Sequence, residues 1–298
     1  MLRSIENRQI ETDKEAFIYA DSICHNAKWN LPSLFYCNSK TKKGECCFTH
    51  LIGLPIHPAT HSPLDLTDYQ LEFANKVINS KPQKYIINKG RQMGFTEIVL
   101  RVIQYEALVG KYAGGKIGIM AGTSADLARK NLRRLWELFR EISYTVKDTH
   151  FKGHLIRLNN GTTIEAFKAS EESLTGDTKY RCIFMDEAAK WRLRDDSGVF
   201  SSIMPIVQSN NSDLFVISTP KGPIKKFHEI WTGHNDFEKL EYPIHRAEGN
   251  LYSTEQIETM LSESVEDINQ EYLCQFTAGR NSIFAQYDQD SDYEEIEL

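Results

Sequence analysis

One segment has the residues and spacing of a phosphate-binding loop. Residues 89–96 (KGRQMGFT) follow the apolar run 85–88 and precede a helical pattern. Backbone N–H groups at the start of a helix and the positive end of its dipole bind anions, and a threonine hydroxyl can ligate Mg²⁺. The segment is therefore a candidate site for a nucleotide phosphate.

This loop departs from the common template G-x-x-x-x-G-K-[ST] at two positions. Gly94 and Thr96 match the second glycine and the hydroxyl, whereas Lys89 stands at the first glycine position and Phe95 at the lysine position. Because the loop needs a cation against the β and γ phosphates, we expect Lys89 to reach across from its other end. Taken alone, the segment also fits an ordinary strand-to-helix turn with a basic surface.

A second segment ends an apolar run in two acids. Residues 181–185 lead into Asp186 and Glu187. At the carboxyl edge of a sheet, beside the loop, Asp186 can hold Mg²⁺ through water and Glu187 can polarise an attacking water. Acid pairs also occur as solvated strand ends, so this segment alone is a moderate signal.

A third apolar run, residues 214–217, ends in Ser218, Thr219 and Pro220, and the two hydroxyls can sense a γ-phosphate. Three strand ends with suitable chemistry, in this order, rarely arise by accident. Together they predict a nucleotide-hydrolysing site.

The elements that must position these residues alternate along the chain. We expect helices over 68–80, 96–109, 124–142 and around 199–208, and strands over 85–88, 116–121, 154–158, 162–167, 182–185 and 214–217. Strands alternating with helices predict an α/β fold with a mostly parallel central sheet flanked by helices on both faces.

Composition excludes several classes of protein. The chain has 298 residues, of which 41% are hydrophobic and 26% charged, which is typical of one large or two modest globular domains and not of collagen, a disulfide scaffold or a wholly disordered chain. The sequence contains neither an apolar run long enough for a membrane span nor a signal peptide. We therefore expect no membrane association and a cytoplasmic location. The net charge of −6 neither demands nor forbids a nucleic-acid partner.

The two ends of the chain differ from its middle. We divide it into an N-terminal extension over 1–64, a main domain over 65–284 and an acidic tail over 285–298, which we expect to be disordered. The extension carries Cys24, Cys37, Cys46 and Cys47 among several histidines. Reduced thiols are the default interpretation, and a zinc site stays open although the chain has no CxxC pair.

From about Leu66 to Phe284 the sequence resembles the ATPase domain of terminase large subunits, the motors that package DNA into the proheads of tailed viruses. Residues 89–96 look like the family's Walker A loop, and the strand that ends at Asp186 looks like Walker B. Residues 158–164 and 175–176 match the family's hairpin and the approach to the acidic strand, and residues 218–222 are similar to its coupling motif. The resemblance implies a P-loop NTPase fold of the RecA/ASCE-like kind.

The resemblance also implies roles for single residues. Gln70 would read the adenine, Arg91 would act as a finger on the γ-phosphate, and Glu187 would be the catalytic glutamate. Lys89 would join Arg91 in neutralising charge, Thr96 and Asp186 would hold Mg²⁺, and Ser218, Thr219 and Pro220 would couple hydrolysis to movement. The nucleotide-binding residues would be Gln70, Lys89, Gly90, Arg91, Gln92, Met93, Gly94, Phe95 and Thr96.

The implied cofactors are ATP and Mg²⁺, and the implied partners are double-stranded DNA, a portal, a small terminase subunit and further copies of the chain in a ring. Terminases normally carry a C-terminal nuclease domain, and few residues follow Phe284, so we expect no DNA cleavage by this chain itself, with the nuclease either supplied by a separate subunit or lost. The basic candidates for DNA contact are Arg129, Lys130, Arg133, Arg134, Lys190, Arg192, Arg194, Lys225 and Lys226. The competing interpretation of each cluster is a solvated surface, with Leu135, Trp136 and Leu138 forming the buried side of one helix.

Two other functions compete with a packaging motor. A helicase or another DNA-remodelling ATPase would share the loop and the acid pair, but a second motor lobe needs more than the roughly seventy residues that follow the coupling motif. A catalytically weak nucleotide-binding scaffold or regulatory subunit would explain Phe95. Retention of Lys89, Asp186 and Glu187 together argues against a decayed site.

Overall fold

The computed structural model describes residues 66–78, 80–108, 110–141, 150–173, 179–263 and 267–277. The N-terminal extension with its four cysteines, residues 175–176 and the acidic tail lie outside the described residues. The domain boundaries at 64 and 284 therefore stay predictions.

The centre of the molecule is an eight-stranded sheet with the order β3-β4-β5-β2-β6-β7-β1-β8. Its strands are β1 (Lys84–Lys89), β2 (Lys116–Ala121), β3 (His150–Phe151), β4 (Leu155–Arg157), β5 (Thr163–Phe167), β6 (Tyr180–Asp186), β7 (Asp213–Ser218) and β8 (Glu238–Tyr242). All pairings from β5 to β8 are parallel, and β3 and β4 pair antiparallel at one edge. The expected mostly parallel sheet is confirmed.

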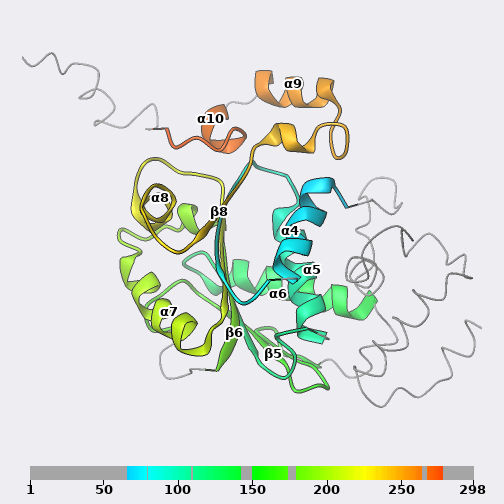
Figure 1. Cartoon of the computed structure of the whole chain (residues 1–298), viewed down its shortest axis with the longest axis vertical. Coiled ribbons are helices and arrows are strands. Elements are labelled where there is room, and N and C mark those ends of the chain that lie inside the picture. Colours follow the sequence, from blue (N-terminus) through cyan, green and yellow to red (C-terminus); the bar gives the residue numbers. More distant parts are fainter. Residues whose placement is uncertain are drawn as a thin grey trace, which may run out of the picture.

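Helices cover both faces of this sheet (Figure 1). One face packs against α4 (Asp68–Ile78), α5 (Phe95–Leu108) and α6 (Ala125–Glu141), and the other against α7 (Ser197–Asn210) and α8 (Lys225–Thr232). The 3₁₀ turn η1 (Ala188–Lys190) follows β6, while η2 (Ile244–Ala247), α9 (Thr254–Glu263) and α10 (Ile268–Glu271) gather at one end of the sheet.

The central strands bury both of their faces. Phe184 and Ile217 join the core under α4, α5 and α6, whereas their neighbours Met185 and Val216 join the core under α7 and α8. Because alternate side chains enter opposite apolar layers, these strands read as continuous apolar runs in the sequence. The expected strand and helix bounds therefore agree with the observed bounds to within a few residues.

Strand β8 and helix α9 are two of the observed elements that were not predicted from the sequence. Strand β8 (EKLEY) is an edge strand with exposed Lys239 and Glu241, so its sequence lacks the apolar run that marks a central strand. Helix α9 is only partly buried, and Ile257 is the buried residue among those whose burial the structure describes. The formation of β8 and α9 depends on tertiary contacts more than on the apolar pattern of their own sequences.

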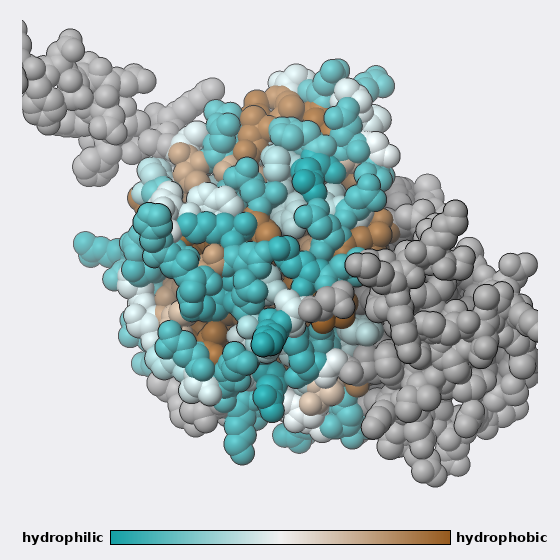
Figure 2. All heavy atoms as spheres, in the orientation of Figure 1, coloured by the Kyte–Doolittle hydropathy of each residue, from teal (hydrophilic) through white to brown (hydrophobic). Residues whose placement is uncertain are grey.

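The outer surface is mostly hydrophilic in the view of Figure 2, where apolar side chains gather in small separate groups. Among the described residues the exposed large apolar side chains are Leu127 and Ile224. Every described helix is too short or too polar to cross a lipid bilayer.

A buried polar cluster joins the end of α5 to the start of β7. Glu106, only 2% exposed, accepts a hydrogen bond from the Lys111 backbone N–H at 2.6 Å. Lys111 Nζ lies 2.8 Å from an Asp213 carboxylate oxygen, and Tyr112 Oη donates to the same oxygen. Burial raises the pKa of Glu106 to about 7, against the lowering effect of the Lys111 N–H and charge.

The raised pKa of Glu106 predicts that pH changes stability through this residue. Between about pH 5 and pH 7 the carboxyl is ionised in the unfolded chain but protonated in the folded protein, so the free energy of unfolding falls as the pH rises. Glu106→Gln keeps an acceptor for Lys111 and removes this titration. Urea unfolding at pH 5 and at pH 8 measures the effect. Between these two pH values the free energy of unfolding of wild type should fall by on the order of 2 kcal/mol more than that of the variant. Equal losses in the two proteins would contradict this assignment.

Candidate active site

The three strand ends singled out in the sequence meet at one edge of the sheet. Strands β6, β7 and β1 are neighbours, with Asp186 opposite Ile217 and Asn88 opposite Ser218. All three strands are parallel, so Lys89, Asp186 and Ser218 reach the same carboxyl edge. This is the edge at which α/β sheets bind ligands.

An ion pair lies at the centre of this edge. Lys89 Nζ is 2.6 Å from Glu187 Oε1, and the Lys89 side chain is 8% exposed while that of Glu187 is 27% exposed. A charge-assisted bond of this length is strong when it is shielded from water. Lys89 therefore reaches from the start of the loop to the acidic strand. Its expected contact with nucleotide phosphates stays a prediction.

The backbone of Glu187 adopts a left-handed conformation, with φ 51° and ψ 42°. A non-glycine residue there carries strain of about 1 kcal/mol or more, which commonly marks a functional position. The turn brings Glu187 Oε2 within 3.4 Å of both Ser218 Oγ and Thr219 Oγ1. Pro220 is buried directly after these residues. The hydroxyls of the third segment thus contact the carboxylate of the second.

Asp186 is held at both carboxylate oxygens. Thr96 Oγ1 lies 3.3 Å from Oδ1, and Asn131 Nδ2 donates to Oδ2 at 2.6 Å. The sequence analysis missed Asn131, which lies on α6 and is 7% exposed. A polar residue between Ala128, Leu132 and Leu135 on the apolar face of a helix was the signal that could have found it.

The two carboxylates have opposite pKa shifts. Burial, reinforced by the charge of Glu187, raises the pKa of Asp186 to about 6. Burial also acts to raise the pKa of Glu187, but the charge and hydrogen bond of Lys89 outweigh it and hold that pKa below its usual value. Neighbouring acids with divergent pKa values are typical of catalytic sites.

Phe95, at the position of the usual lysine, belongs to the hydrophobic core. It is 2% exposed, and its ring centroid lies 5.8 Å from that of Tyr69, 5.7 Å from Phe73 and 4.4 Å from Tyr242. These partners come from α4 and β8, so the aromatic ring anchors the loop and the start of α5 to both elements. A lysine here would place its charge inside the core.

Gln70 braces the loop from α4. Its amide Nε2 lies 3.4 Å from the Met93 carbonyl, and its Oε1 accepts from the Thr67 N–H at 3.1 Å. Tyr69 Oη also donates to the Met93 carbonyl, at 2.8 Å. Gly94 has φ +67°, a conformation that strains residues with a side chain, and a Cβ there would come within 2.8 Å of Gln70 Nε2, so this position favours glycine.

A C-terminal segment packs on the other side of the loop. The Arg91 N–H donates to the Glu271 carbonyl at 2.6 Å, the Gly90 N–H donates to the Tyr242 carbonyl at 2.8 Å, and Tyr252 Oη donates to the Gln92 carbonyl at 2.9 Å. The Arg91 side chain is exposed beside the loop.

The oxygen atoms at this edge fit a magnesium ion. Mg²⁺ takes oxygen ligands at about 2.1 Å in octahedral geometry, so two adjacent ligands lie about 3.0 Å apart. Thr96 Oγ1 and Asp186 Oδ1 are 3.3 Å apart. Mg²⁺ commonly takes one or two protein ligands and completes its shell with water and phosphate.

The family model for the terminase large subunit, T4likevirus-type, N-terminal, matches residues 86–289 of the chain. The chain belongs to the terminase large subunit family. The match starts within β1 and includes the loop, both carboxylates and Ser218, so it covers the whole carboxyl edge of the site.

Solved terminases share the fold. The ATPase domain of the Thermus phage P74-26 large terminase is similar with a TM-score of 0.52 and 21% identity over 68% of this chain and 93% of that domain. The large terminase of bacteriophage HK97 gives a TM-score of 0.61 and 15% identity over 76% of this chain and 54% of that one. The large terminase of the thermophilic bacteriophage D6E, in complex with ATP-gamma-S, gives a TM-score of 0.54 and 13% identity over 72% of this chain and 53% of that one. The chain thus spans about half the length of these last two proteins.

Several of the basic candidates for DNA contact are engaged within the chain. Lys190 Nζ lies 2.8 Å from a Glu271 carboxylate oxygen, Lys225 Nζ donates to the Trp191 carbonyl at 2.6 Å, and Arg134 pairs with Glu97. Exposed side chains include Arg129, Lys130, Arg133, Arg192 and Arg194. As expected, Leu135 and Leu138 are buried on the inner side of α6, and Trp136 packs against the same core.

The packing of Phe95 predicts the outcome of restoring the usual lysine. Phe95→Lys should lower the free energy of unfolding by about 3–5 kcal/mol, because it removes three ring contacts and buries a charge. Phe95→Leu, the matched apolar control, should cost less than half as much. Urea unfolding of the three proteins measures both effects. If Phe95→Lys had the same free energy of unfolding as wild type, the packing of Phe95 in the core would not explain the missing lysine.

Proposed function

We propose that the chain is a Mg-ATP-hydrolysing motor subunit that drives double-stranded DNA into a viral prohead. The observation that carries this proposal is the convergence of Lys89, Glu187, Asp186 and Thr96 at the carboxyl edge of β1 and β6. Membership of the terminase large subunit family and a structural relative in complex with ATP-gamma-S support the same function.

The phosphates would bind at the loop between β1 and α5. The N-terminal end of α5 offers backbone N–H groups and a positive dipole, and Lys89 and Arg91 would neutralise charge on the γ-phosphoryl group. Gln70 would contact the adenine from α4. Thr96 and Asp186 would hold Mg²⁺, which when bound supplies further neutralisation of phosphate charge.

Glu187 would orient the attacking water and accept its proton. The bond that forms joins the water oxygen to the γ-phosphorus, and the bond that breaks releases ADP. Without nucleotide, Lys89 keeps Glu187 ionised and weakly basic. A γ-phosphate that attracts Lys89 would remove this partner from Glu187 and raise its basicity, so the base becomes competent when substrate is bound.

Ser218 and Thr219 would report hydrolysis, since both hydroxyls contact the Glu187 carboxylate. Movement would pass through Pro220 to the segment that follows. The domain over residues 65–284 would act in a ring of copies on a portal, in the host cytoplasm. A small terminase subunit and a separately encoded nuclease would assist it.

The role of Lys89 is tested against a lysine at the other end of the same strand. Lys89→Ala should lower the ATP turnover number by roughly 10²–10³, the loss typical of removing one group that stabilises transition-state charge. Lys84→Ala, which breaks a partly exposed pair with Asp236 and a cation–π contact with Phe237, should stay within about twofold of wild type. A steady-state phosphate-release assay measures the ATP turnover number of the three proteins. Equal turnover in wild type and Lys89→Ala would remove Lys89 from the mechanism.

The role of Glu187 is tested by separating binding from chemistry. Glu187→Gln keeps the size of the side chain and one acceptor oxygen for Lys89, and its amide N–H groups can donate to the two hydroxyls. The amide cannot take a proton, so hydrolysis should fall by about 10²–10⁴. Binding of fluorescent ATP should persist, since no phosphate-binding group is removed. Hydrolysis at the wild-type rate by this variant would contradict the proposed general base.

A further inference from the structure

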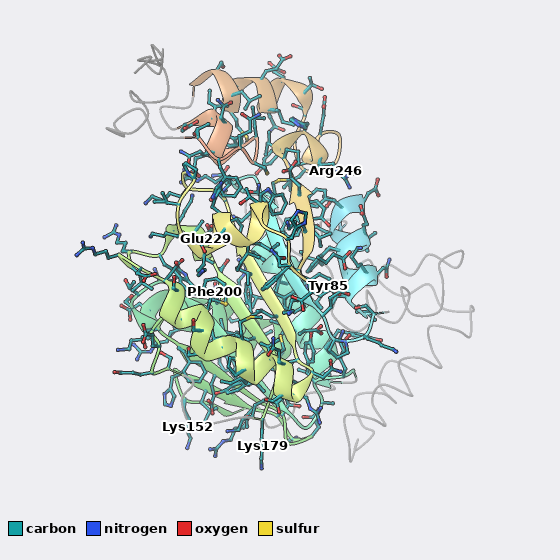
Figure 3. All side chains as sticks on the ribbon, turned by 60° about the vertical axis from the view of Figure 1, so that its left-hand side comes forward. Tyr85, Lys152, Lys179, Phe200, Glu229 and Arg246 are labelled. Atoms are coloured by element: carbon teal, nitrogen blue, oxygen red, sulfur yellow. The ribbon has the colours of Figure 1, made fainter. Side chains whose placement is uncertain are left out.

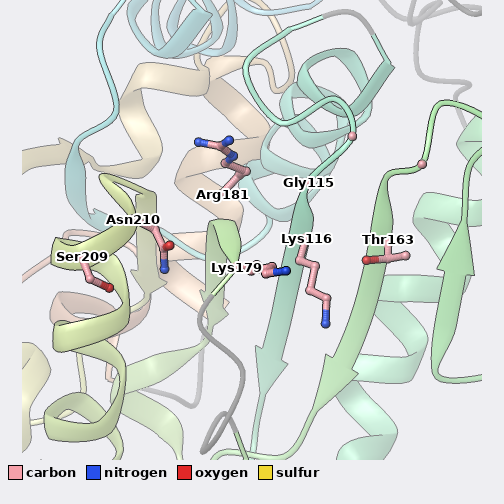
Figure 4. A pocket seen from close by; sticks show the side chains of 9 residues that line it. Gly115, Lys116, Thr163, Lys179, Arg181, Ser209 and Asn210 are labelled. Atoms are coloured by element: carbon pink, nitrogen blue, oxygen red, sulfur yellow. The ribbon is translucent and has the colours of Figure 1, made fainter.

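A second cavity lies at the opposite edge of the sheet from the candidate active site. It has a volume of about 540 Å³ and opens where β2, β5 and β6 begin (Figure 4). Strand β6 connects the two places, because Arg181 lies at the cavity and Asp186 at the active site. Five residues of extended strand separate them by roughly 16 Å. We name this cavity the amino-edge pocket.

The lining of the amino-edge pocket is cationic. Lys116, Lys179 and Arg181 line it together with the hydroxyl of Ser209 and the amide of Asn210, and none of its nine lining residues is acidic or aromatic. In Figure 4, Lys116 and Lys179 lie between Asn210 at the end of α7 and Thr163 at the start of β5. Ammonium, guanidinium, hydroxyl and amide donors are the groups that contact nucleic-acid phosphates.

Glycine residues leave main chain exposed in the wall of the amino-edge pocket. A Cβ on Gly115 would lie 2.4 Å from Arg181 Cγ, so the stem of Arg181 rests directly against the Gly115 backbone. Gly114 and Gly161 also line the pocket and leave its wall without side chains. A bulky phosphodiester backbone can therefore approach the main chain closely.

The cations continue along the edge beyond the pocket. Arg157, at the end of β4, lies opposite Thr163 and is exposed. Arg157, Lys116 and Arg181 thus occupy the same edge on β4, β2 and β6, with β5 between the first two. Three strand spacings of about 4.8 Å make this row about 14 Å long. Figure 3 shows Lys152 and Lys179 projecting at the same lower end, far from Arg246 beside the active-site end.

We propose that the amino-edge pocket binds the sugar–phosphate backbone of double-stranded DNA, an inference that takes its choice of ligand from the proposed function. The row of three cations is about 14 Å long, on the scale of a few phosphates of one DNA strand, which carries one charge per 3.4 Å of axis. The lack of aromatic lining leaves no platform on which bases could stack, so contact is sequence-independent. The active site and the DNA contact then occupy opposite ends of the same strands.

The experiment compares two charge reversals of equal size in the full chain. Lys179→Glu with Arg181→Glu alters the pocket, and Glu keeps the stem that covers Gly115. Arg129→Glu with Arg133→Glu alters exposed α6 positions, the rival candidates for DNA contact named in the sequence analysis, and changes the net charge by the same amount. The probe is a fluorescein-labelled 30-base-pair duplex, followed by anisotropy at 50 and 200 mM salt. Basal ATP hydrolysis without DNA serves as a separate readout.

The pocket variant should bind the duplex at least about tenfold more weakly at 50 mM salt than the α6 variant, and its salt slope should fall by about 2 from the wild-type value. Basal hydrolysis should be unchanged in both variants, since neither pair lies at the active site. Equal affinity of the two variants for the duplex would overturn the proposal. So would a wild-type protein that binds a polyglutamate peptide but not the duplex. A wild type without ATP hydrolysis but with pocket-dependent DNA binding would defeat the proposed function and leave this site standing.

Discussion

The contact between the Lys89 ammonium and the Glu187 carboxylate is the interaction on which the arrangement of the site depends. It joins the end of β1 to the residue after β6 across the end of β7, so all three strands must be parallel, adjacent and in register. A parallel sheet of this kind is covered by helices on both faces, so its central strands are continuous apolar runs. The pair also holds the Glu187 carboxylate in place beside Ser218 and Thr219.

The position of the cation follows from the hydrophobic core. Phe95 fills a space enclosed by aromatic rings of α4 and β8, and that burial fixes where the loop enters α5. With this position committed to packing, a phosphate-binding cation has to come from another part of the loop. Lys89 is the last residue of a buried strand, so its side chain starts from a rigid position and loses little freedom when it pairs.

Sequence patterns predicted the strands and helices of the sheet closely, because apolar runs and helical periodicity report burial directly. They also predicted that Lys89, Asp186, Glu187 and Ser218 would meet, since parallel strands share one carboxyl edge. Asn131 was missed because its partner Asp186 is 55 residues away, and single-chain spacing says nothing of such a contact. The contacts of Gln70 and Glu271 with the loop backbone were equally invisible, because any residue supplies a carbonyl and only the fold selects which one.

In the proposed mechanism, Lys89 replaces the usual loop lysine as the cation for the nucleotide phosphates. A crystal structure of the chain with Mg²⁺ and ATP-gamma-S tests it most directly, through the position of a single atom. We expect Lys89 Nζ to leave Glu187 and to lie about 3 Å from a γ-phosphate oxygen, with Phe95 still in the core. A structure in which Lys89 stays on Glu187 while another cation contacts the phosphates would contradict it.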